Sequence, residues 1–183
     1  MTDFTTLRSP RIAVIGAGMC GLACAHQLRA EGFAPTIFEK SRGLGGRLAT
    51  RRVDDGITFD HGAQYMTARG VAFQEMLQQA MNCGAAGHWA PTQCERESHA
   101  AENWIVGTPG MNTIVKPLAK GIDVQFATEV IAIDRDAGGW CVRTQSNPGC
   151  VVFDFVVLTA PAPQARALMA FNPEIQEGLD RVS

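Results

Sequence analysis

Three glycines spaced as in a phosphate-binding turn are the first feature that could do chemistry. The run is Gly16, Ala17, Gly18, Met19, Cys20 and Gly21. In a G-x-G-x-x-G turn the first glycine allows the tight turn, the second lets the backbone approach a pyrophosphate, and the third lets helix and strand pack closely. The anion binds to the unpaired N–H groups of the helix N-terminus. The glycines alone are a weak signal, because a tight strand-to-helix turn without a nucleotide carries the same pattern.

The elements on both sides of this turn strengthen the prediction of a nucleotide site. The apolar run Ile12–Ile15 predicts a strand buried on both faces, and residues 19–31 predict a helix that stops at Gly32. Residues 35–38 predict a second strand, which ends at the acid Glu39. An acid in this position accepts hydrogen bonds from ribose hydroxyls, and its charge disfavours a 2′-phosphate. Residues 11–39 therefore predict a βαβ dinucleotide-binding unit.

The rest of the chain predicts a parallel sheet, a β-meander and further helices. We expect a loop at 41–52, a short strand at 57–59, helices at 71–82, 111–119 and 164–171, and a strand at 104–106, with 83–103 polar and irregular. Residues 124–126, 129–133, 140–144 and 151–158 predict the strands of the meander, the last one returning to the parallel sheet. The fold class is therefore α/β, Rossmann-like, with a parallel sheet and a β-meander.

Composition predicts an ordinary globular protein. With 46% apolar and 19% charged residues and a formal charge of -2, the chain offers no basis for a nucleic-acid or membrane partner. The six cysteines form no CxxC pair, so we expect reduced thiols and no metal site. The N-terminus has no uninterrupted apolar run of the kind found in signal peptides, so we expect a cytoplasmic protein.

A second glycine-rich segment distinguishes a flavin-binding site from a nicotinamide-binding site. From Gly16 to Arg47 the chain resembles the FAD-binding N-terminus of the flavin amine oxidase superfamily, through the run Ser41-Arg42-Gly43-Leu44-Gly45-Gly46-Arg47. The resemblance implies FAD as cofactor. It implies contacts with the pyrophosphate and ribityl chain from Gly45, Gly46 and Arg47, a phosphate contact from Arg42, and a site around Glu39 that includes Phe38 and Lys40.

The same resemblance extends over most of the chain. It implies that Asp60–Tyr65 runs beside the isoalloxazine, that backbone at the start of the meander holds the adenine, and that the loop after the last strand closes over the cofactor. The implied cofactor-binding residues are His61, Gly62, Ala63, Gln64, Val130, Thr159, Ala160 and Pro161. His61 is equally compatible with a role in the core.

Within the superfamily the chain resembles the renalase group most, through Gly43–Thr50, Asp60–Tyr65 and Gly110–Lys116. The resemblance to that group implies oxidation of 1,2- and 1,6-dihydro isomers of NAD(P)H to NAD(P)+. Molecular oxygen would be the electron acceptor and hydrogen peroxide the product. Hydride transfer from a dihydropyridine yields an aromatic pyridinium, so alignment suffices and no general base is needed. The implied residues on the substrate face are His61, Gln64 and Tyr65.

Two other functions stay open at this point. One is an amine oxidase or desaturase of the same superfamily, and the other is a nucleotide-binding module without turnover. We expect the FAD-binding domain at 10–66 and 104–183, with an inserted segment at 67–103 that begins a substrate domain. A later Gly-Asp segment typical of the superfamily does not occur before Ser183. We therefore expect a truncated product or part of a longer gene product, of unknown oligomeric state.

Overall fold

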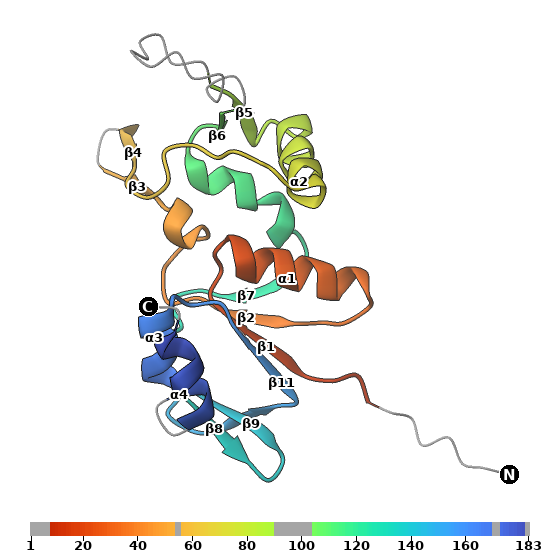
Figure 1. Ribbon diagram of the computed structural model, residues 1–183, viewed down its shortest axis with the longest axis vertical. Helices are drawn as coiled ribbons and strands as arrows, with labels where there is room; N and C mark the ends of the chain where they lie inside the picture. The colour runs from red at the N-terminus through yellow and green to blue at the C-terminus, as the bar shows by residue number, and fades with distance from the viewer. Residues whose placement is uncertain (1–7, 54–55, 90–103, 170–172, 182–183) are drawn as a thin grey trace, which may run out of the picture. The chain divides into compact units, whose positions relative to one another are not determined.

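A computed structural model describes residues 8–53, 56–89, 104–169 and 173–181 (Figure 1). The chain forms two compact units, each described by itself below. Unit 1 comprises residues 1–42 and 121–183, and unit 2 comprises residues 43–120. This division follows packing, and the domain assignment made from the sequence, with an inserted segment at 67–103, stays a prediction.

A four-stranded parallel sheet is the centre of unit 1. Its strand order is β11-β1-β2-β7, and each neighbouring pair is parallel. The strands are β1 (Ile12–Ile15), β2 (Thr36–Phe38), β7 (Asp123–Gln125) and β11 (Phe155–Leu158). Helix α1 (Met19–Ala30) packs against β1 and β2 through the buried Leu22 and Ala25. The predicted α/β, Rossmann-like fold is thus present. The continuous apolar run of β1 is buried throughout, as expected for a strand that other elements cover on both faces.

An antiparallel β-meander completes the strands of unit 1. It consists of β8 (Val130–Asp136), β9 (Gly139–Thr144) and β10 (Val151–Phe153), in the order β10-β9-β8. Apolar side chains of the meander and of the parallel sheet share one core, in which Phe38 meets Phe153 edge to face at 5.7 Å. Apolar contacts of this kind bind the meander to the sheet.

Two strand predictions differ from the structure, the first in its pairing and the second in its continuity, although the end of the second does return to the parallel sheet as expected. The strand expected at 124–126 belongs to the parallel sheet as β7, not to the meander. The single strand expected at 151–158 is two strands, interrupted at Asp154. The carboxylate of Asp154 accepts hydrogen bonds from the backbone N–H of Arg11 and from the guanidinium of Arg8, both at 2.7 Å. This contact turns the chain from the meander into the parallel sheet.

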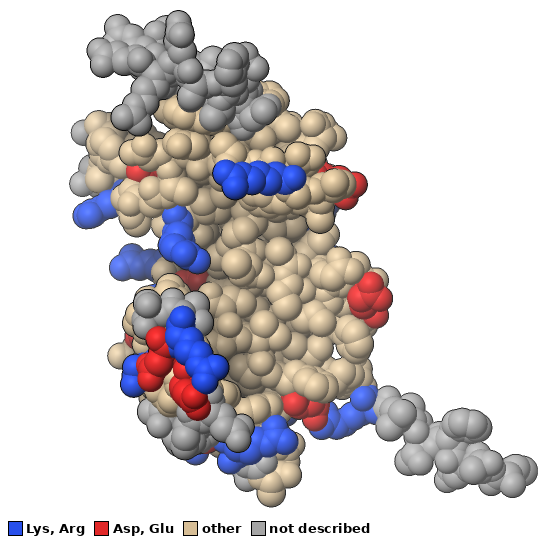
Figure 2. Space-filling view, viewed as in Figure 1, with Lys and Arg blue, Asp and Glu red and all other residues tan. Residues whose placement is uncertain are grey.

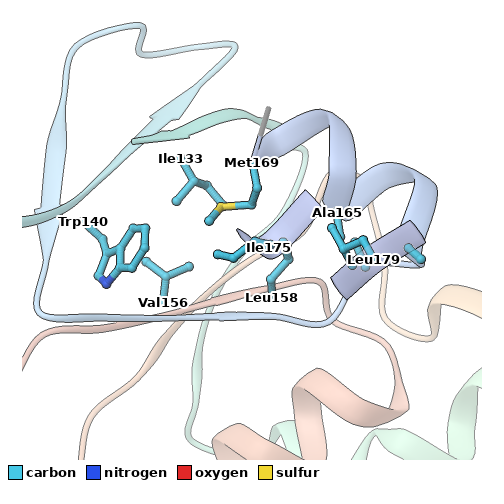
Figure 3. A pocket seen from close by; sticks show the side chains of 10 residues that line it. Ile133, Trp140, Val156, Leu158, Ala165, Met169, Ile175 and Leu179 are labelled. Carbon is cyan, nitrogen blue, oxygen red and sulfur yellow. The ribbon is translucent and has the colours of Figure 1, made fainter. Parts of the chain in front are cut away.

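Two helices follow the last strand of unit 1. They are α3 (Ala162–Leu168) and α4 (Pro173–Asp180); the end of the predicted helix at 164–171 lies outside the described residues. Basic and acidic side chains intermingle over these helices (Figure 2), where Arg166 pairs with Asp180 and Arg181 with Glu177. The helices, the meander and β11 line an apolar cavity of about 410 Å³ that is open to solvent on one side, and Ile133, Val156 and Met169 point into it (Figure 3).

Unit 2 is built from short elements around one long helix. Helix α2 (Val71–Asn82) has the bounds predicted from its apolar positions. It packs against strand β5 (Ala86–His88) and the 3₁₀ helix η4 (Met111–Val115). The strands form two antiparallel pairs, β3 (Thr50–Arg52) with β4 (Thr58–Asp60) and β5 (Ala86–His88) with β6 (Ile105–Gly107). The 3₁₀ helices are η1 (Gly46–Leu48), η4 (Met111–Val115) and η5 (Pro117–Ala119).

The helix predicted at 111–119 is wrong as an α-helix, because the segment forms η4 and η5 instead. Pro117 has no N–H to donate, which ends η4 and starts η5. The hydroxyl of Thr113 donates to the carbonyls of Gly110 and Ala85, at 2.6 and 2.8 Å. A side chain that binds the preceding backbone competes with regular helix formation.

The expectation of reduced cysteines is wrong for one pair. Cys141 and Cys150 form a disulfide between β9 and the residue before β10, with Cα atoms 5.3 Å apart. Cys20, Cys24 and Cys83 are free, and Cys94 lies outside the described residues. Within the described part of the chain, no helix is long and apolar enough to cross a membrane. Across the same residues, no group of three His, Cys, Asp or Glu side chains could hold a metal ion.

Candidate functional site

The glycine turn in unit 1 has a geometry that larger residues could not adopt. Gly16 has a φ of +106°, and its N–H donates to the carbonyl of Phe38 at 2.9 Å, which joins β1 to β2. A Cβ on Gly21 would lie 1.9 Å from the carbonyl oxygen of Gly16. The close approach of helix and strand therefore requires glycine at position 21, as the sequence pattern predicts.

The N-terminus of α1 is open for an anion. Gly18 is its N-cap residue, and among the described residues no side chain caps it and no acid stands in the first turn. The first hydrogen bond of the helix runs from the N–H of Leu22 to Gly18, so the amides of Met19, Cys20 and Gly21 have no acceptor within the helix. Such amides and the helix dipole favour a phosphate. The residues present therefore fit the pyrophosphate of a dinucleotide cofactor.

The conformation of Gly18 does not itself demand glycine. Its φ of −81° and ψ of −176° are extended backbone that any residue adopts. Glycine at this position is therefore not needed for the fold of the turn. A close approach of a ligand to the backbone gives a physical reason for it.

Glu39 lies directly beside the turn, and only 6% of it is exposed. Its Oε2 accepts a hydrogen bond from the N–H of Ala17 at 2.7 Å, and its Oε1 accepts one from the N–H of Ser41 at 2.8 Å. A carboxylate has about four acceptor positions, so two remain for other donors such as ribose hydroxyls. The backbone of Glu39 is hydrogen-bonded to the backbones of Gln125 and Thr128, and no pattern in the sequence singles out these two residues.

Thr159 packs against the glycine turn from β11. Its hydroxyl donates to the carbonyl of Ile15 at 2.7 Å, and its Oγ1 lies 3.0 Å from where a Cβ on Gly16 or Gly21 would stand. The two residues after it lie elsewhere in unit 1, since Ala160 lines the apolar cavity and Pro161 is the N-cap residue of α3. Thr159 therefore supports the turn, and cofactor roles for Thr159, Ala160 and Pro161 stay predictions.

The remaining residues expected in unit 1 divide into core and surface. The side chains of Phe38 and Val130 are buried in the core, so only their backbones could contact a cofactor. Lys40 is exposed and its Nζ lies 3.5 Å from Oε1 of Gln164. Arg42 is exposed.

Burial raises the pKa of the Cys24 thiol on α1, which keeps it protonated at neutral pH and unsuited to nucleophilic chemistry.

In unit 2 the structure brings together the two segments expected to lie along the flavin. The N–H of Ala63 donates to the carbonyl of Arg47 at 2.9 Å. A Cβ on Gly62 would lie 2.0 Å from the same oxygen, so only glycine allows this approach. Gly45 and Gly46 have φ values of +127° and +55°, which turn the chain into η1. The Arg47 side chain is exposed and available to an anion.

Hydrogen bonds around Thr50 and Asp60 connect a third segment to these two. Oδ1 of Asp60 accepts from the hydroxyl of Thr50 at 2.5 Å and from the N–H of Met111 at 3.0 Å. Oγ1 of Thr50 accepts from the N–H of Asn112 at 3.3 Å. A Cβ on Gly45 would lie 3.1 Å from that of Asn112. The three segments that carry the family resemblance therefore form one structure, and the sequence did not identify Thr50 or Asp60 as its centre.

The three residues expected on the substrate face have different surroundings. His61 and Gln64 are exposed. Tyr65 stacks on Trp104, with ring centroids 4.1 Å apart and planes at 12°. Trp89 lies against both rings. The two tryptophans were not predicted as site residues, although two of the chain's three tryptophans stand on either side of residues 90–103, a signal that could have found them.

Comparison with known proteins identifies the family. Residues 14–80 match the model of an NAD(P)-binding Rossmann-like domain, and residues 72–182 match that of the flavin containing amine oxidoreductases. Renalase of Mus musculus is 30% identical over 164 residues, which are 84% of this chain and 48% of that protein. A 4,4'-diapophytoene desaturase (4,4'-diaponeurosporene-forming) of Staphylococcus haemolyticus is 53% identical over 51 residues, 28% of this chain and 10% of the desaturase.

Solved structures share the fold at low sequence identity. A CLA-producing fatty acid isomerase from P. acnes has a TM-score of 0.72 at 14% identity, and the match covers 93% of this chain and 63% of that one. The tetracycline destructase Tet(51) has a TM-score of 0.61 at 19% identity, with 92% and 43% covered. The chain spans about half the length of the mouse renalase that it matches. Because its family model covers more than half of the chain, this protein belongs to the flavin containing amine oxidoreductases.

Proposed function

We propose that the protein works as a renalase-like, FAD-dependent oxidase that converts 1,2- and 1,6-dihydro isomers of NAD(P)H to NAD(P)+. The observation that carries the proposal is the similarity to renalase over 84% of the chain, which includes residues of both units. The joined segments Gly43–Thr50, Asp60–Tyr65 and Gly110–Lys116 of unit 2 support it.

FAD is the cofactor that the family membership assigns, and each unit offers groups suited to one part of it. In unit 1 the open amides of α1 would bind the pyrophosphate, and Glu39 would accept the ribose hydroxyls. In unit 2 the backbone of Gly62 and Ala63 would lie beside the flavin ring, as the family resemblance implies. Arg42 and Arg47 would supply positive charge to the phosphates.

The proposed reaction balances without a general base. FAD, when bound, would supply the hydride acceptor and the route for two electrons to oxygen. One dihydropyridine nucleotide, one proton and one oxygen molecule thus yield NAD(P)+ and hydrogen peroxide. The protein's own contribution is alignment, because the hydride is transferred only when donor and acceptor stand at the right distance and angle. His61, Gln64 and Tyr65 would hold the dihydropyridine in that position.

The first test is an absorbance spectrum of the purified chain, followed by addition of NADH isomers prepared by borohydride reduction of NAD+. We expect flavin bands that bleach without air, and hydrogen peroxide formed in air. Ordinary 1,4-NADH is the control substrate and should react far more slowly. Flavin bands that do not bleach would contradict the substrate and favour an amine oxidase or desaturase. A protein without flavin bands would contradict the oxidase proposal for this chain and favour a module without turnover.

A further inference from the structure

Three aromatic side chains gather at one place in unit 2 and form what we call the aromatic platform: Tyr65, Trp89 and Trp104. Tyr65 and Trp104 are stacked at 4.1 Å between ring centroids. Trp89 lies 5.3 Å from Trp104 and 6.3 Å from Tyr65, tilted against both. These distances are those of aromatic rings in mutual contact.

The platform is not a closed hydrophobic core. Tyr65 and Trp89 each keep 39% of their surface exposed. Aromatic rings that are fully buried against one another have little surface in contact with water, whereas these two side chains still present ring area to solvent. Exposed aromatic surface of this kind is what a flat ligand requires for stacking.

Backbone hydrogen bonds fix the three rings in place. The N–H of Trp89 donates to the carbonyl of Trp104 at 2.9 Å. Met66, the residue after Tyr65, exchanges two hydrogen bonds with Ile105, the residue after Trp104. Paired backbone therefore carries Trp89 and Trp104 and directly follows Tyr65, so less main-chain freedom is lost when a ligand stacks on the rings.

The platform lies next in the chain to the segment expected along the flavin. Tyr65 is two residues after Ala63, whose N–H is bound to the carbonyl of Arg47. Two extended residues span at most about 7 Å. Tyr65 therefore lies within this reach of the backbone that is proposed to face the flavin.

We propose that the aromatic platform binds the purine ring of a dinucleotide substrate. The proposal rests on the proposed function, because a dihydropyridine dinucleotide has a second ring that needs a binding surface once its first ring lies on the flavin. A purine has a π-face that stacks on tyrosine and tryptophan without demanding a matched set of hydrogen-bond partners. The platform would thus act on substrate affinity rather than on hydride transfer.

Tryptophan fluorescence tests the platform without turnover. In a Trp140→Phe background Trp89 and Trp104 are the remaining tryptophans, so their emission reports on the platform alone. We expect adenosine monophosphate to quench this emission in the FAD-loaded protein, and ribose 5-phosphate to leave it unchanged. Replacing Tyr65 by leucine should weaken binding of the nucleotide about tenfold, since one stacking surface is lost, whereas Tyr65→Phe keeps the ring and should bind as the parent does.

In the FAD-loaded protein the glycine turn of unit 1 is the proposed site of the cofactor's own pyrophosphate, so quenching by added nucleotide reports on a second site. Quenching that is weaker in Tyr65→Leu than in Tyr65→Phe supports the platform. Quenching of equal strength in both variants would place the nucleotide elsewhere and overturn the proposal, as would a parent protein whose emission does not respond.

Turnover separates the two proposals. If the oxidase proposal holds, Trp89→Leu, a change in a ring with no assigned contact to the dihydropyridine, should raise KM for the dihydro isomer of the dinucleotide about tenfold and leave KM for that of nicotinamide mononucleotide unchanged. Equal changes for both substrates would overturn the purine assignment while leaving the oxidase proposal intact. Quenching by adenosine monophosphate in a protein that oxidises neither substrate would support nucleotide stacking and contradict the oxidase.

Discussion

The N–H of Ala17 donates a hydrogen bond of 2.7 Å to Oε2 of Glu39, so the acid after β2 holds the glycine turn after β1. The second oxygen of the same carboxylate binds the N–H of Ser41, where the chain leaves the βαβ unit. Glu39 therefore has a structural role that the sequence pattern does not reveal, in addition to the proposed contact with ribose.

Replacing Glu39 by glutamine tests both roles. The amide group can accept only at its oxygen, so the N–H of Ala17 or of Ser41 is left facing an NH2 donor without an acceptor, at a cost of about 1–3 kcal/mol in the free energy of unfolding. We expect a lower urea midpoint and much weaker FAD retention. Glu31→Gln, an exposed change at the end of α1, is the matched control and should alter neither. A Glu39→Gln protein that binds FAD as tightly as the parent contradicts the ribose role.

Gly18→Val should remove the cofactor and leave the fold intact. The backbone at Gly18 is extended, so valine fits its conformation, but the branched side chain would stand where the pyrophosphate approaches. Gly70 offers a close control, because it also caps a helix in extended conformation and a Cβ there meets nothing within 4 Å. We expect Gly18→Val to lose flavin absorbance at an unchanged urea midpoint, and Gly70→Val to keep both. Full FAD content in Gly18→Val disproves the phosphate-loop assignment.

The elements around this turn could be predicted because they rest on local signals. The apolar run before Gly16 and the glycines after it determine strand and turn without distant partners, and the apolar spacing of residues 71–82 does the same for α2. Strand pairing carries no such signal. Whether residues 123–125 join the meander or the parallel sheet depends on contacts with β2, and the break at Asp154 depends on the backbone of Arg11.

Gly62→Ala should destabilise unit 2 by about 3 kcal/mol or more, because the new methyl group would lie 2.0 Å from the carbonyl oxygen of Arg47. Backbone must move to admit it, and the paired segments expected along the flavin then separate. Gly43→Ala in the same unit meets nothing within 4 Å and serves as control. Urea unfolding and flavin content measure the two effects. Equal midpoints for both variants would show that Gly62 and Arg47 do not approach each other so closely.

Asp154 should give the protein a pH-dependent share of its stability. The N–H of Arg11 holds the pKa of this carboxyl below its ordinary value, and Arg8 acts in the same direction. A folded-state pKa below the unfolded one means that the contribution is complete above the unfolded pKa and is lost as the pH falls through the folded one. Asp154→Asn should therefore lower the free energy of unfolding at neutral pH and lose this effect in strong acid.

Unfolding curves over a range of pH check this, with Asp123→Asn, an exposed change at the start of β7, as control. A difference between Asp154→Asn and the parent that stays constant down to strong acid would refute the ionic origin of the contribution.

The candidate site could be predicted only in part, for a physical reason. Glycines and Glu39 are recognisable because backbone geometry and ribose chemistry restrict the residue type at each position. Thr50, Asp60, Trp89 and Trp104 are not recognisable in this way, since each matters through partners far along the chain. The sequence therefore indicates the cofactor better than the substrate.

The pairing of β1 with β11 has a consequence for the order of events during synthesis. β1 leaves the ribosome before unit 2, but its partner on one side, β11, is made only after the whole of unit 2. Unit 2 is continuous in sequence and can fold first, as segments completed earlier during translation generally do. Until β11 is made, one edge of β1 stays unpaired. An unpaired apolar strand edge promotes aggregation, so chaperones have a defined interval in which to protect the nascent chain.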